Sequence, residues 1–200
     1  MAELLLASTN PGKIKEFQAL LKNKEIKLVT PKQLGLDIQV EETGTTYADN
    51  ARLKGLAFMR ASGLVTMADD TGLEVFALDG APGVRSARFS PKPAATDADR
   101  RNFLLESLKE EQRPWLARFR CVIALVTPQE DSHFSKGICV GEIIPQEIGK
   151  RGFGYDPIFF IPEFGRTMAQ LSMEDKNRVS HRAHAVRAAQ NTILSLLNST

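Results

Sequence analysis

The sequence is poor in cysteine, in aromatic residues and in charge of one sign. Its 200 residues include two cysteines, one tryptophan and two tyrosines, and the formal net charge is +2. Cys121 and Cys139 stand far apart in apolar segments and form no CxxC pair, which predicts two buried thiols rather than a disulfide framework or a metal site. Because no run of five or six like charges occurs, we expect no nucleic-acid partner and no membrane surface.

Long hydrophobic runs are missing as well. Segments such as CVIALV at 121–126 are far too short to span a membrane, and the chain does not open on a basic segment followed by an apolar core. We therefore expect a cytoplasmic protein. The hydrophobic share of 42% is ordinary for a globular chain, and a length of 200 residues predicts one domain, 1–200. Such a domain buries roughly 70% of its unfolded surface and needs no disulfide to fold.

Apolar periodicity predicts a mixture of strands and helices. Helices are expected at 10–23, 46–62, 97–109 and in the C-terminal region, including 185–197. Strands are expected at 3–8, 26–30, 64–68, 73–78, 118–126, 134–144 and 156–162. Because a run of strands occupies the middle of the chain, the pattern favours a mixed α/β sheet over a regular alternation of strand and helix.

A short polar loop, STNPGK at 8–13, joins the first predicted strand to the first predicted helix. Asn10 suits the helix N-cap, and Pro11 suits the first helical position, where its missing N–H is no loss. Gly12 admits close approach to the backbone, and Lys13 adds a positive charge. Free N–H donors, the positive end of the helix dipole and an ammonium together predict an anion site. An ordinary capped helix with a solvated lysine is the alternative.

Two acidic pairs form a second candidate site. Asp69 and Asp70 follow an apolar stretch, and Glu41 and Glu42 stand in an irregular segment. Successive residues of a strand point to opposite faces, so both aspartates can face one ligand only if the chain turns, and we expect a turn at Thr71-Gly72. The set suits Mg²⁺, which takes one or two carboxylates together with waters and phosphate oxygens. An ordinary turn and a solvated loop are the alternatives.

The last quarter of the chain adds an aromatic loop and a basic cluster. Phe153 and Tyr155 stand between and beside glycines in KRGFGYDPIFF, which predicts a stacking platform for a base or, alternatively, a tight turn around a buried aromatic. Ser180 suits a helix N-cap that places His181 and Arg182 in the first turn, where cations oppose the dipole unless an anion or acceptor is near. A solvated basic face is the alternative for Lys176, Arg178, His181, Arg182, His184 and Arg187.

The chain closely resembles the non-standard purine nucleoside triphosphate pyrophosphatases, the inosine triphosphatase or HAM1-like family, in its bacterial type. The resemblance runs from Leu5 to about Leu197 and rests on STNPGK, EETGTTYADNARLK, ADDTGLEV, GAPGVRSARF, GFGYDPIF and SHRAHA in this order. The combination of GFGYDPIF with a later SHR is highly specific. The segment FSPKPAATDAD departs from the Y-S-G and acidic residues that bacterial members typically carry there.

The resemblance implies an α/β fold, with an elongated mixed β-sheet flanked by helices and two lobes with a central cleft. It implies Mg²⁺-dependent hydrolysis of ITP, dITP or XTP to the monophosphate and pyrophosphate, which cleanses the nucleotide pool, and a homodimer. The alternative is a Maf-like nucleotide pyrophosphatase acting on modified pyrimidine nucleotides. A nucleotide-binding module without turnover is disfavoured, because binding a polyanion gains nothing from extra carboxylates unless a metal is held.

The resemblance also assigns roles to residues by their position. Asp70 is the general base and a metal-linked acid, and one of Glu41 and Glu42 helps to hold Mg²⁺. Lys54 is a further phosphate-side residue, and Thr71 contacts the substrate. The residues implied around the triphosphate are Ser8, Thr9, Asn10, Pro11, Gly12 and Lys13. The residues implied around the base are Phe153, Gly154, Tyr155, Asp156, Lys176, His181 and Arg182.

Overall fold

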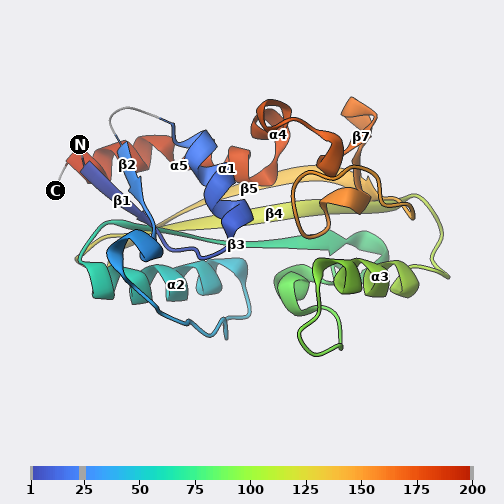
Figure 1. The fold of residues 1–200 in the computed structure, drawn as a ribbon, viewed down its shortest axis with the longest axis horizontal. Coiled ribbons are helices and arrows are strands. Elements are labelled where there is room, and N and C mark those ends of the chain that lie inside the picture. Colours follow the sequence, from blue (N-terminus) through green and yellow to red (C-terminus); the bar gives the residue numbers. More distant parts are fainter. Residues whose placement is uncertain (1, 23–25, 199–200) are drawn as a thin grey trace. The chain divides into compact units, whose positions relative to one another are not determined.

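The computed structural model describes residues 2–22 and 26–198, which form a seven-stranded mixed sheet flanked by helices (Figure 1). The strands are β1 (Ala2–Leu6), β2 (Ile26–Val29), β3 (Thr66–Val75), β4 (Trp115–Val126), β5 (Ser132–Ile143), β6 (Phe159–Ile161) and β7 (Arg166–Thr167). The helices are α1 (Pro11–Leu20), α2 (Tyr47–Ser62), α3 (Asp97–Ser107), α4 (Met173–Val179) and α5 (His181–Asn198). Residues 1, 23–25 and 199–200 of the predicted domain lie outside the described residues, and residue 23 is also the last residue of the first predicted helix.

The sheet has parallel strands at one end and antiparallel strands at the other. Its order is β2-β1-β3-β4-β5-β6-β7. β1 pairs in parallel with β2 and β3, so that Leu5 stands opposite both Val29 and Thr66. β6 pairs antiparallel with β5 and with β7. The predicted mixed α/β sheet is confirmed, because a regular alternation of strand and helix would give parallel neighbours throughout.

The chain divides into two compact units. Unit 1 consists of Met1–Asp70, Cys121–Gly137 and His181–Thr200, and unit 2 consists of Thr71–Arg120 and Ile138–Ser180. The strands β3, β4 and β5 each pass from one unit into the other. The boundary on β3 falls between Asp70 and Thr71, so the predicted catalytic carboxylate belongs to unit 1.

Unit 1 is a three-layer arrangement with helices on both faces of the sheet (Figure 1). Cys121 and Ile123 of β4 pack in one cluster with Phe17 of α1 and with the apolar face of α5. The alternate residue Ala124 joins a different cluster with α2. The two-residue period of the strand therefore supplies both layers.

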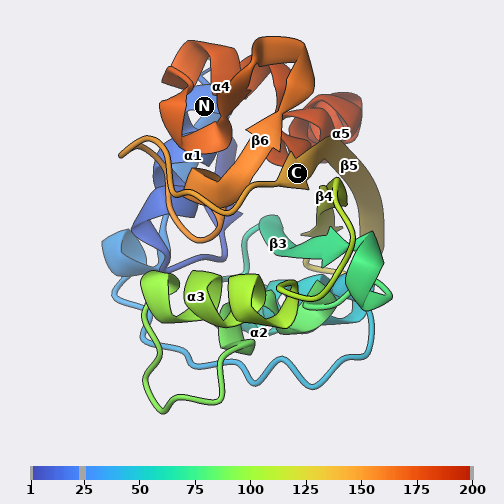
Figure 2. The same cartoon turned by 90° about the vertical axis from the view of Figure 1, so that its right-hand side faces the viewer.

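Unit 2 has one large apolar cluster on one face of its sheet. Leu104 and Leu108 of the α3 region pack there against inward residues of β4 such as Ala117 and Phe119. The short strand β6 lies between β5 and the edge strand β7, and α4 is seen near it in Figure 2. The outward residues on the opposite face of β4 and β5 include Leu116, 50% exposed, and Val140, 65% exposed.

The predicted helix boundaries are largely confirmed, because they rest on local capping chemistry. Thr46 caps α2 in a capping box with Asp49, and Gly63 ends the helix in the left-handed conformation at φ +69°. Thr96 caps α3 in the same way. Ser180 has an extended backbone between α4 and α5, so His181 does begin a new helix.

The predicted turn at Thr71-Gly72 is wrong. β3 continues through it from Thr66 to Val75, and only Phe76–Leu78 leaves the strand as a 3-10 turn. Nearly every residue of β3 is buried, and the strand lies between β1 and β4, so burial and ladder bonds outweigh the local turn preference of the Thr-Gly pair. The strand predicted at 156–162 likewise shrinks to β6, because Asp156–Ile158 forms a 3-10 turn around its proline.

One glycine lets β5 approach α5 closely. A Cβ atom on Gly137 would lie 2.0 Å from the carbonyl oxygen of His181 and 2.3 Å from the amide nitrogen of Ala185. The neighbouring Ser135 hydroxyl donates a hydrogen bond to the Ala185 carbonyl at 3.0 Å. The backbone of β5 therefore touches the first turns of α5 directly.

Candidate active site

The polar loop before α1 is shaped by Asn10. The Asn10 side-chain oxygen accepts hydrogen bonds from the N–H groups of Gly12 at 2.9 Å and Lys13 at 3.1 Å, and Ser8 accepts from the Asn10 N–H at 3.3 Å. Asn10 and Pro11 thus occupy the predicted N-cap and first helical positions. This cap satisfies the amides of Gly12 and Lys13, so the charge that the loop offers is the ammonium of Lys13.

A buried ion network joins this helix to β3 and α5. The Lys13 ammonium lies 2.8 Å from the Asp69 carboxylate, and the guanidinium of Arg182 lies 3.9 Å from the same oxygen. Arg182 also pairs with Glu16 of α1, and both are almost fully buried. Burial raises the pKa of Asp69, but Lys13, Arg182 and Lys54 outweigh it and hold that pKa well below its usual range. Asp69 is therefore an ionised partner for cations.

Asp70 faces a different set of groups. It is 5% exposed and accepts a hydrogen bond from the Asn50 side-chain amide of α2 at 3.1 Å. Burial raises the pKa of Asp70, and repulsion from Glu42 adds to this, while Lys54, Lys13 and the bond from Asn50 act in the opposite direction. The net result is a raised pKa, which makes this carboxylate a stronger base than an exposed aspartate.

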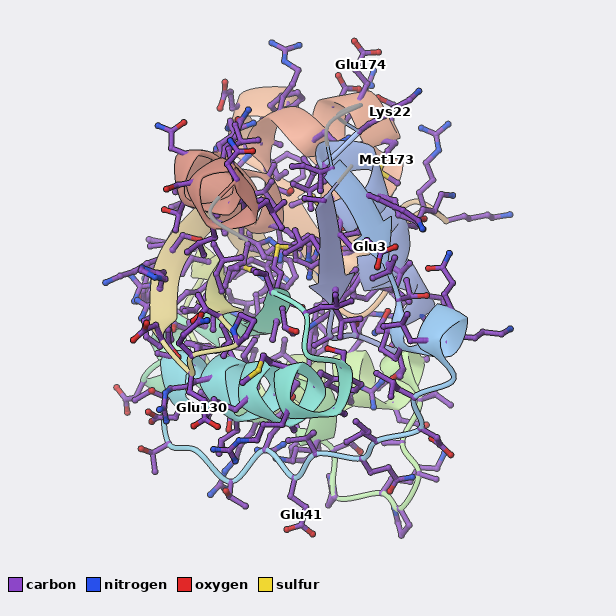
Figure 3. All side chains as sticks on the ribbon, turned by 90° about the vertical axis from the view of Figure 1, so that its left-hand side faces the viewer. Glu3, Lys22, Glu41, Glu130, Met173 and Glu174 are labelled. Carbon is purple, nitrogen blue, oxygen red and sulfur yellow. The ribbon has the colours of Figure 1, made fainter. Side chains whose placement is uncertain are left out.

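The two predicted glutamates, Glu41 and Glu42, differ in their exposure to solvent and in their contacts. The Glu42 carboxylate lies 2.7 Å from the Lys54 ammonium, and both are partly buried. Glu41 is exposed and points away into solvent (Figure 3). Burial lowers the pKa of Lys54, but Asp69, Glu42 and Asp70 outweigh it and raise that pKa. Of the two glutamates, Glu42 is the one that shares its surroundings with Asp70.

Unit 1 thus gathers two ammonium groups and three carboxylates, namely Lys13, Lys54, Glu42, Asp69 and Asp70. Among the described residues no group of three or more His, Cys, Asp or Glu side chains forms a complete metal cage. Two carboxylates that repel each other do fit Mg²⁺, because this ion keeps several waters and completes its shell with phosphate oxygens.

In unit 2 the aromatic loop is fixed from within. The Asp156 carboxylate accepts from the Phe153 N–H at 3.0 Å and from the Lys176 ammonium at 2.6 Å, and that ammonium lies 5.4 Å from the centre of the Phe153 ring. The Tyr155 hydroxyl donates to the Ser86 carbonyl at 2.9 Å. Three of these side chains are buried, with exposed fractions of 4% for Tyr155, 4% for Asp156 and 5% for Lys176, while Phe153 is partly buried. Phe153 is therefore the member of this loop whose ring is best placed to meet a ligand.

Two of the residues predicted around the base lie in unit 1, whereas Gly154 lies in unit 2. His181 and Arg182 begin α5 and are 3% and 1% exposed. The structure brings Arg182 to Glu16 and Asp69, and within unit 1 its charge serves that network. Thr71, the remaining predicted contact, is partly buried on β3 at the start of unit 2.

Sequence reasoning missed four residues that contact the predicted site residues: Glu16 and Asn50, and also Asp97 and Arg101, which both bond to the backbone of Gly154. Glu16 stands one turn after Lys13 on α1, but only the fold brings it to Arg182. Asn50 lies inside the motif EETGTTYADN, and its contact with Asp70 crosses from a helix to a strand. No local pattern could have found these pairs, because each joins residues distant in sequence.

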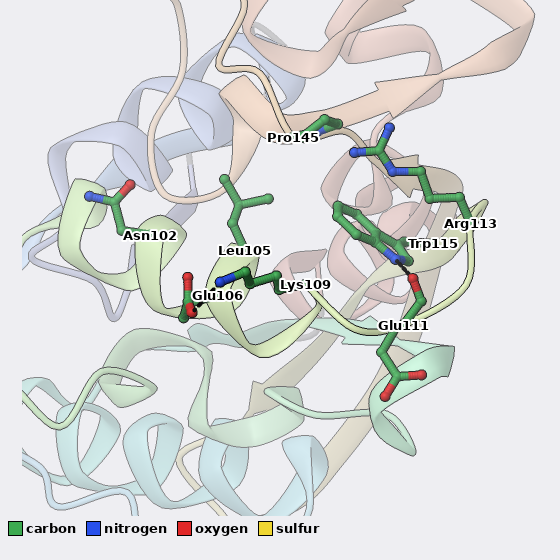
Figure 4. A pocket seen from close by; sticks show the side chains of 8 residues that line it. All are labelled: Asn102, Leu105, Glu106, Lys109, Glu111, Arg113, Trp115 and Pro145. Carbon is green, nitrogen blue, oxygen red and sulfur yellow. Dashed lines mark hydrogen bonds and ion pairs between the residues drawn. The ribbon is translucent and has the colours of Figure 1, made fainter.

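The pocket drawn in Figure 4 belongs to unit 2 and contains none of the predicted site residues. It has a volume of about 560 Å³ and lies between α3 and the start of β4. The Arg113 guanidinium sits 4.6 Å from the Trp115 ring centre, and the Trp115 indole donates to the Glu111 carbonyl at 3.0 Å. Most of the residues that line it are solvent-exposed.

A mixed α/β sheet with ammonium and carboxylate groups beside a capped helix is an arrangement that suits binding of a polyphosphate together with a divalent cation. The chain belongs to the Ham1 family, whose model matches residues 4–192.

Relatives and solved structures agree with this family. The chain is 45% identical over 189 residues to a dITP/XTP pyrophosphatase of Desulforamulus reducens, covering 94% of this chain and 93% of the relative. It is 41% identical over 198 residues to the dITP/XTP pyrophosphatase of Listeria monocytogenes, covering 98% and 97%. A HAM1 protein from Coxiella burnetii superimposes with a TM-score of 0.86 at 40% identity, covering 98% and 99%. These comparisons give no support to the Maf-like alternative.

No helix among residues 2–22 and 26–198 combines the length and the apolar character that crossing a membrane requires.

Proposed function

We propose that this protein hydrolyses non-standard purine nucleoside triphosphates, namely ITP, dITP and XTP, to the monophosphate and pyrophosphate. The main structural observation that supports this proposal is the cluster of Asp70 and Glu42 with Lys13 and Lys54 in unit 1. Two relatives that align with nearly the whole chain, at 45% and 41% sequence identity, bear the name dITP/XTP pyrophosphatase. Cations beside a basic carboxylate are what hydrolysis of a phosphoanhydride needs.

Each member of the cluster has a separate task in this proposal. Lys13 and Lys54 neutralise the charge of the triphosphate, and Asp70 removes a proton from the water that attacks the α-phosphorus. Asp70 and Glu42 would hold Mg²⁺, which when bound polarises the phosphoryl oxygens and stabilises the leaving pyrophosphate. Asp69 keeps the Lys13 ammonium in place, because it is buried, ionised and 2.8 Å away.

In this proposal, selectivity for the base comes from the Phe153 ring and from hydrogen-bond donors among the residues predicted around the base. The Phe153 ring offers a stacking surface, and the base-side roles of Gly154, His181 and Arg182 stay predictions. The 6-keto oxygen of hypoxanthine or xanthine accepts a hydrogen bond, whereas the 6-amino group of adenine would set donor against donor. An unpaired buried group costs about 1–3 kcal/mol, which is enough to separate the two bases.

We also propose that two copies associate through the outward sheet face of unit 2. Leu116 and Val140 are 50% and 65% exposed there, and Ile138 is 37% exposed. Beside them Glu74 pairs with Arg118 at 2.5 Å. A face with apolar side chains and charges of both signs suits a two-fold contact with itself. In this proposal residues 1–200 form one catalytic domain per copy, located in the cytoplasm.

Sedimentation tests the association. We expect a dimer for the wild type and a monomer for Val140→Asp, with Leu34→Asp as a control at an exposed leucine of unit 1. A monomeric wild type, or a dimeric Val140→Asp variant, would contradict this surface.

A pyrophosphate-release assay tests the activity. ITP, XTP, ATP, GTP, dUTP and CTP are compared with and without Mg²⁺. We expect ITP and XTP to be hydrolysed far faster than ATP or GTP, and only with the divalent ion. Comparable kcat/KM for ATP and ITP would refute the proposed selectivity.

A further inference from the structure

We propose that Asp97 and Arg101, at the start of α3, are positioning residues that fix the Phe153-Gly154 segment and thereby set selectivity for the base. This inference rests on the proposed function, which assigns that segment to the base.

Both polar groups of Gly154 are held by one helix. The Gly154 N–H donates to the Asp97 carboxylate at 2.7 Å, and the Arg101 guanidinium donates to the Gly154 carbonyl at 2.8 Å. Asp97 and Arg101 are four residues apart, so they project from the same face of α3. Gly154 has φ +60°, a left-handed conformation that glycine adopts without steric cost.

The two holding side chains are themselves held. The Arg101 guanidinium makes two bonds of 2.8 Å to the Glu147 carboxylate, which fixes the plane of the fork. Asp97 pairs with Arg100. Burial raises the pKa of Asp97, but the Gly154 N–H and Arg100 outweigh it and lower that pKa, so the bond to Gly154 is a charge-assisted one.

The aromatic segment therefore has an inner and an outer support. The inner support is the buried pair of Asp156 and Lys176, whose loss would leave a charge unpaired in the core. In the outer support the Asp97 side chain is 41% exposed and the Arg101 side chain 11% exposed, whereas the Lys176 and Asp156 side chains of the inner support are 6% and 5% exposed. We therefore expect loss of the outer support to displace the Phe153 ring at a smaller cost to folding than loss of the inner support.

The comparison uses two arginines that each form a two-bond ion pair with a glutamate; the Arg101 side chain is 11% exposed and the Arg60 side chain is 60% exposed. Arg101→Ala removes the bond to Gly154 together with the Glu147 pair. Arg60→Ala removes an equivalent two-bond pair with Glu130, at 2.7 and 2.8 Å, on α2 of unit 1. Glu147→Gln weakens the ion pair of Arg101 but leaves its bond to Gly154. A loss confined to Arg101→Ala therefore reports on the contact with Gly154.

Steady-state kinetics with ITP and ATP give the first readout. A misplacement of about 1 Å can cost about 100-fold, so we expect Arg101→Ala to raise KM for ITP by about 10-fold or more. We expect kcat to change by less than about 3-fold, because the substitution does not alter the residues of unit 1 that are proposed to bind the triphosphate. The ITP-to-ATP ratio of kcat/KM should fall by about 10-fold. Arg101→Lys and Asp97→Asn, which retain one donor or one acceptor, should recover part of the loss.

Hydrogen–deuterium exchange of the peptide that contains Gly154 gives a readout independent of catalysis. We expect faster exchange in Arg101→Ala and wild-type exchange in Arg60→Ala.

Unchanged exchange in Arg101→Ala, or an equal loss of kcat/KM for ITP and ATP, would overturn the inference. If Arg101→Ala fails to fold, Arg101→Lys and Asp97→Asn decide by the same criteria. A wild type that releases no pyrophosphate from ITP would instead refute the proposed function, and the exchange result would still decide whether α3 positions Gly154.

Discussion

Asp69 and Asp70 are neighbours on β3 but interact with different helices. The Asp69 carboxylate lies 2.8 Å from the Lys13 ammonium of α1, whereas the Asp70 carboxylate accepts a hydrogen bond from Asn50 of α2 at 3.1 Å. The strand is unbroken here, so its two-residue period sends the two carboxylates to opposite faces. Adjacent residues of the same type thereby have different partners.

Replacing Asp70 tests the proposed base. Asp70→Asn keeps the size of the side chain and an oxygen acceptor for Asn50, but it cannot take a proton and is a poor ligand for Mg²⁺. Loss of a general base typically lowers kcat by about 10²–10⁴-fold, and a weaker metal site adds to that. The measurement is kcat at saturating Mg²⁺, with melting curves as the folding control. Asp69→Asn should reduce kcat less; the reverse order would show that the two assignments are exchanged.

Replacing Lys13 tests the phosphate contact. Lys13→Ala removes one positive charge that the proposal places beside the triphosphate in both the ground state and the transition state, so KM for ITP should rise more than kcat falls. Lys27→Ala is the control, since this lysine pairs with Glu3 on the exposed side of β2. A wild-type KM for Lys13→Ala in a folded protein would remove Lys13 from the phosphate site.

The two glutamates of the EE pair form a natural control for each other. Glu42→Gln should raise the Mg²⁺ concentration needed for half-maximal activity several-fold, because Glu42 shares its surroundings with Lys54 and Asp70. Glu41→Gln should leave the Mg²⁺ requirement unchanged, because that side chain points into solvent. Titration of activity with Mg²⁺ separates the two. Equal effects of both substitutions would contradict the assignment of Glu42.

The lowered pKa of Asp97 predicts a dependence of stability on pH. Its pKa in the folded state lies below the value of 3.8 for an unperturbed aspartate, so the charged form contributes stability above about that pH. This contribution is lost as the pH falls through the folded-state pKa. Wild type should therefore have a higher Tm than Asp97→Asn at pH 7, and the gap should narrow below about pH 4. A gap that stays constant with pH would show that the carboxylate charge is not its source.

Local chemistry made part of the fold predictable. The start of α1 follows from Asn10 and Pro11, and the ends of α2 follow from Thr46 and Gly63, because a cap acts within a few residues of itself. The turn predicted at Thr71-Gly72 failed for the opposite reason. Its propensity is local, but the strand is held by neighbours on both sides, and these come from distant parts of the chain.

The candidate site shows the same limit. Lys13, Asp70 and Phe153 could be singled out by their motifs, but the surroundings of Arg182 could not. Its partner Glu16 stands at the other end of the sequence, and only the packing of α1 against α5 makes the pair. A basic residue after a helix cap predicts a ligand contact and a buried ion pair equally well until the opposite element is known.

The contact at Gly137 sets how tolerant this part of the molecule is to change. Packing between side chains can adjust when one of them is replaced, because rotamers shift to fill or vacate space. Backbone against backbone has no such freedom, and a single methyl group on Gly137 would collide with the carbonyl of His181. The main chain of β5 thus sets the position of the first turn of α5 directly. Core side chains around this contact can change over evolution while the burial of His181 and Arg182 stays the same.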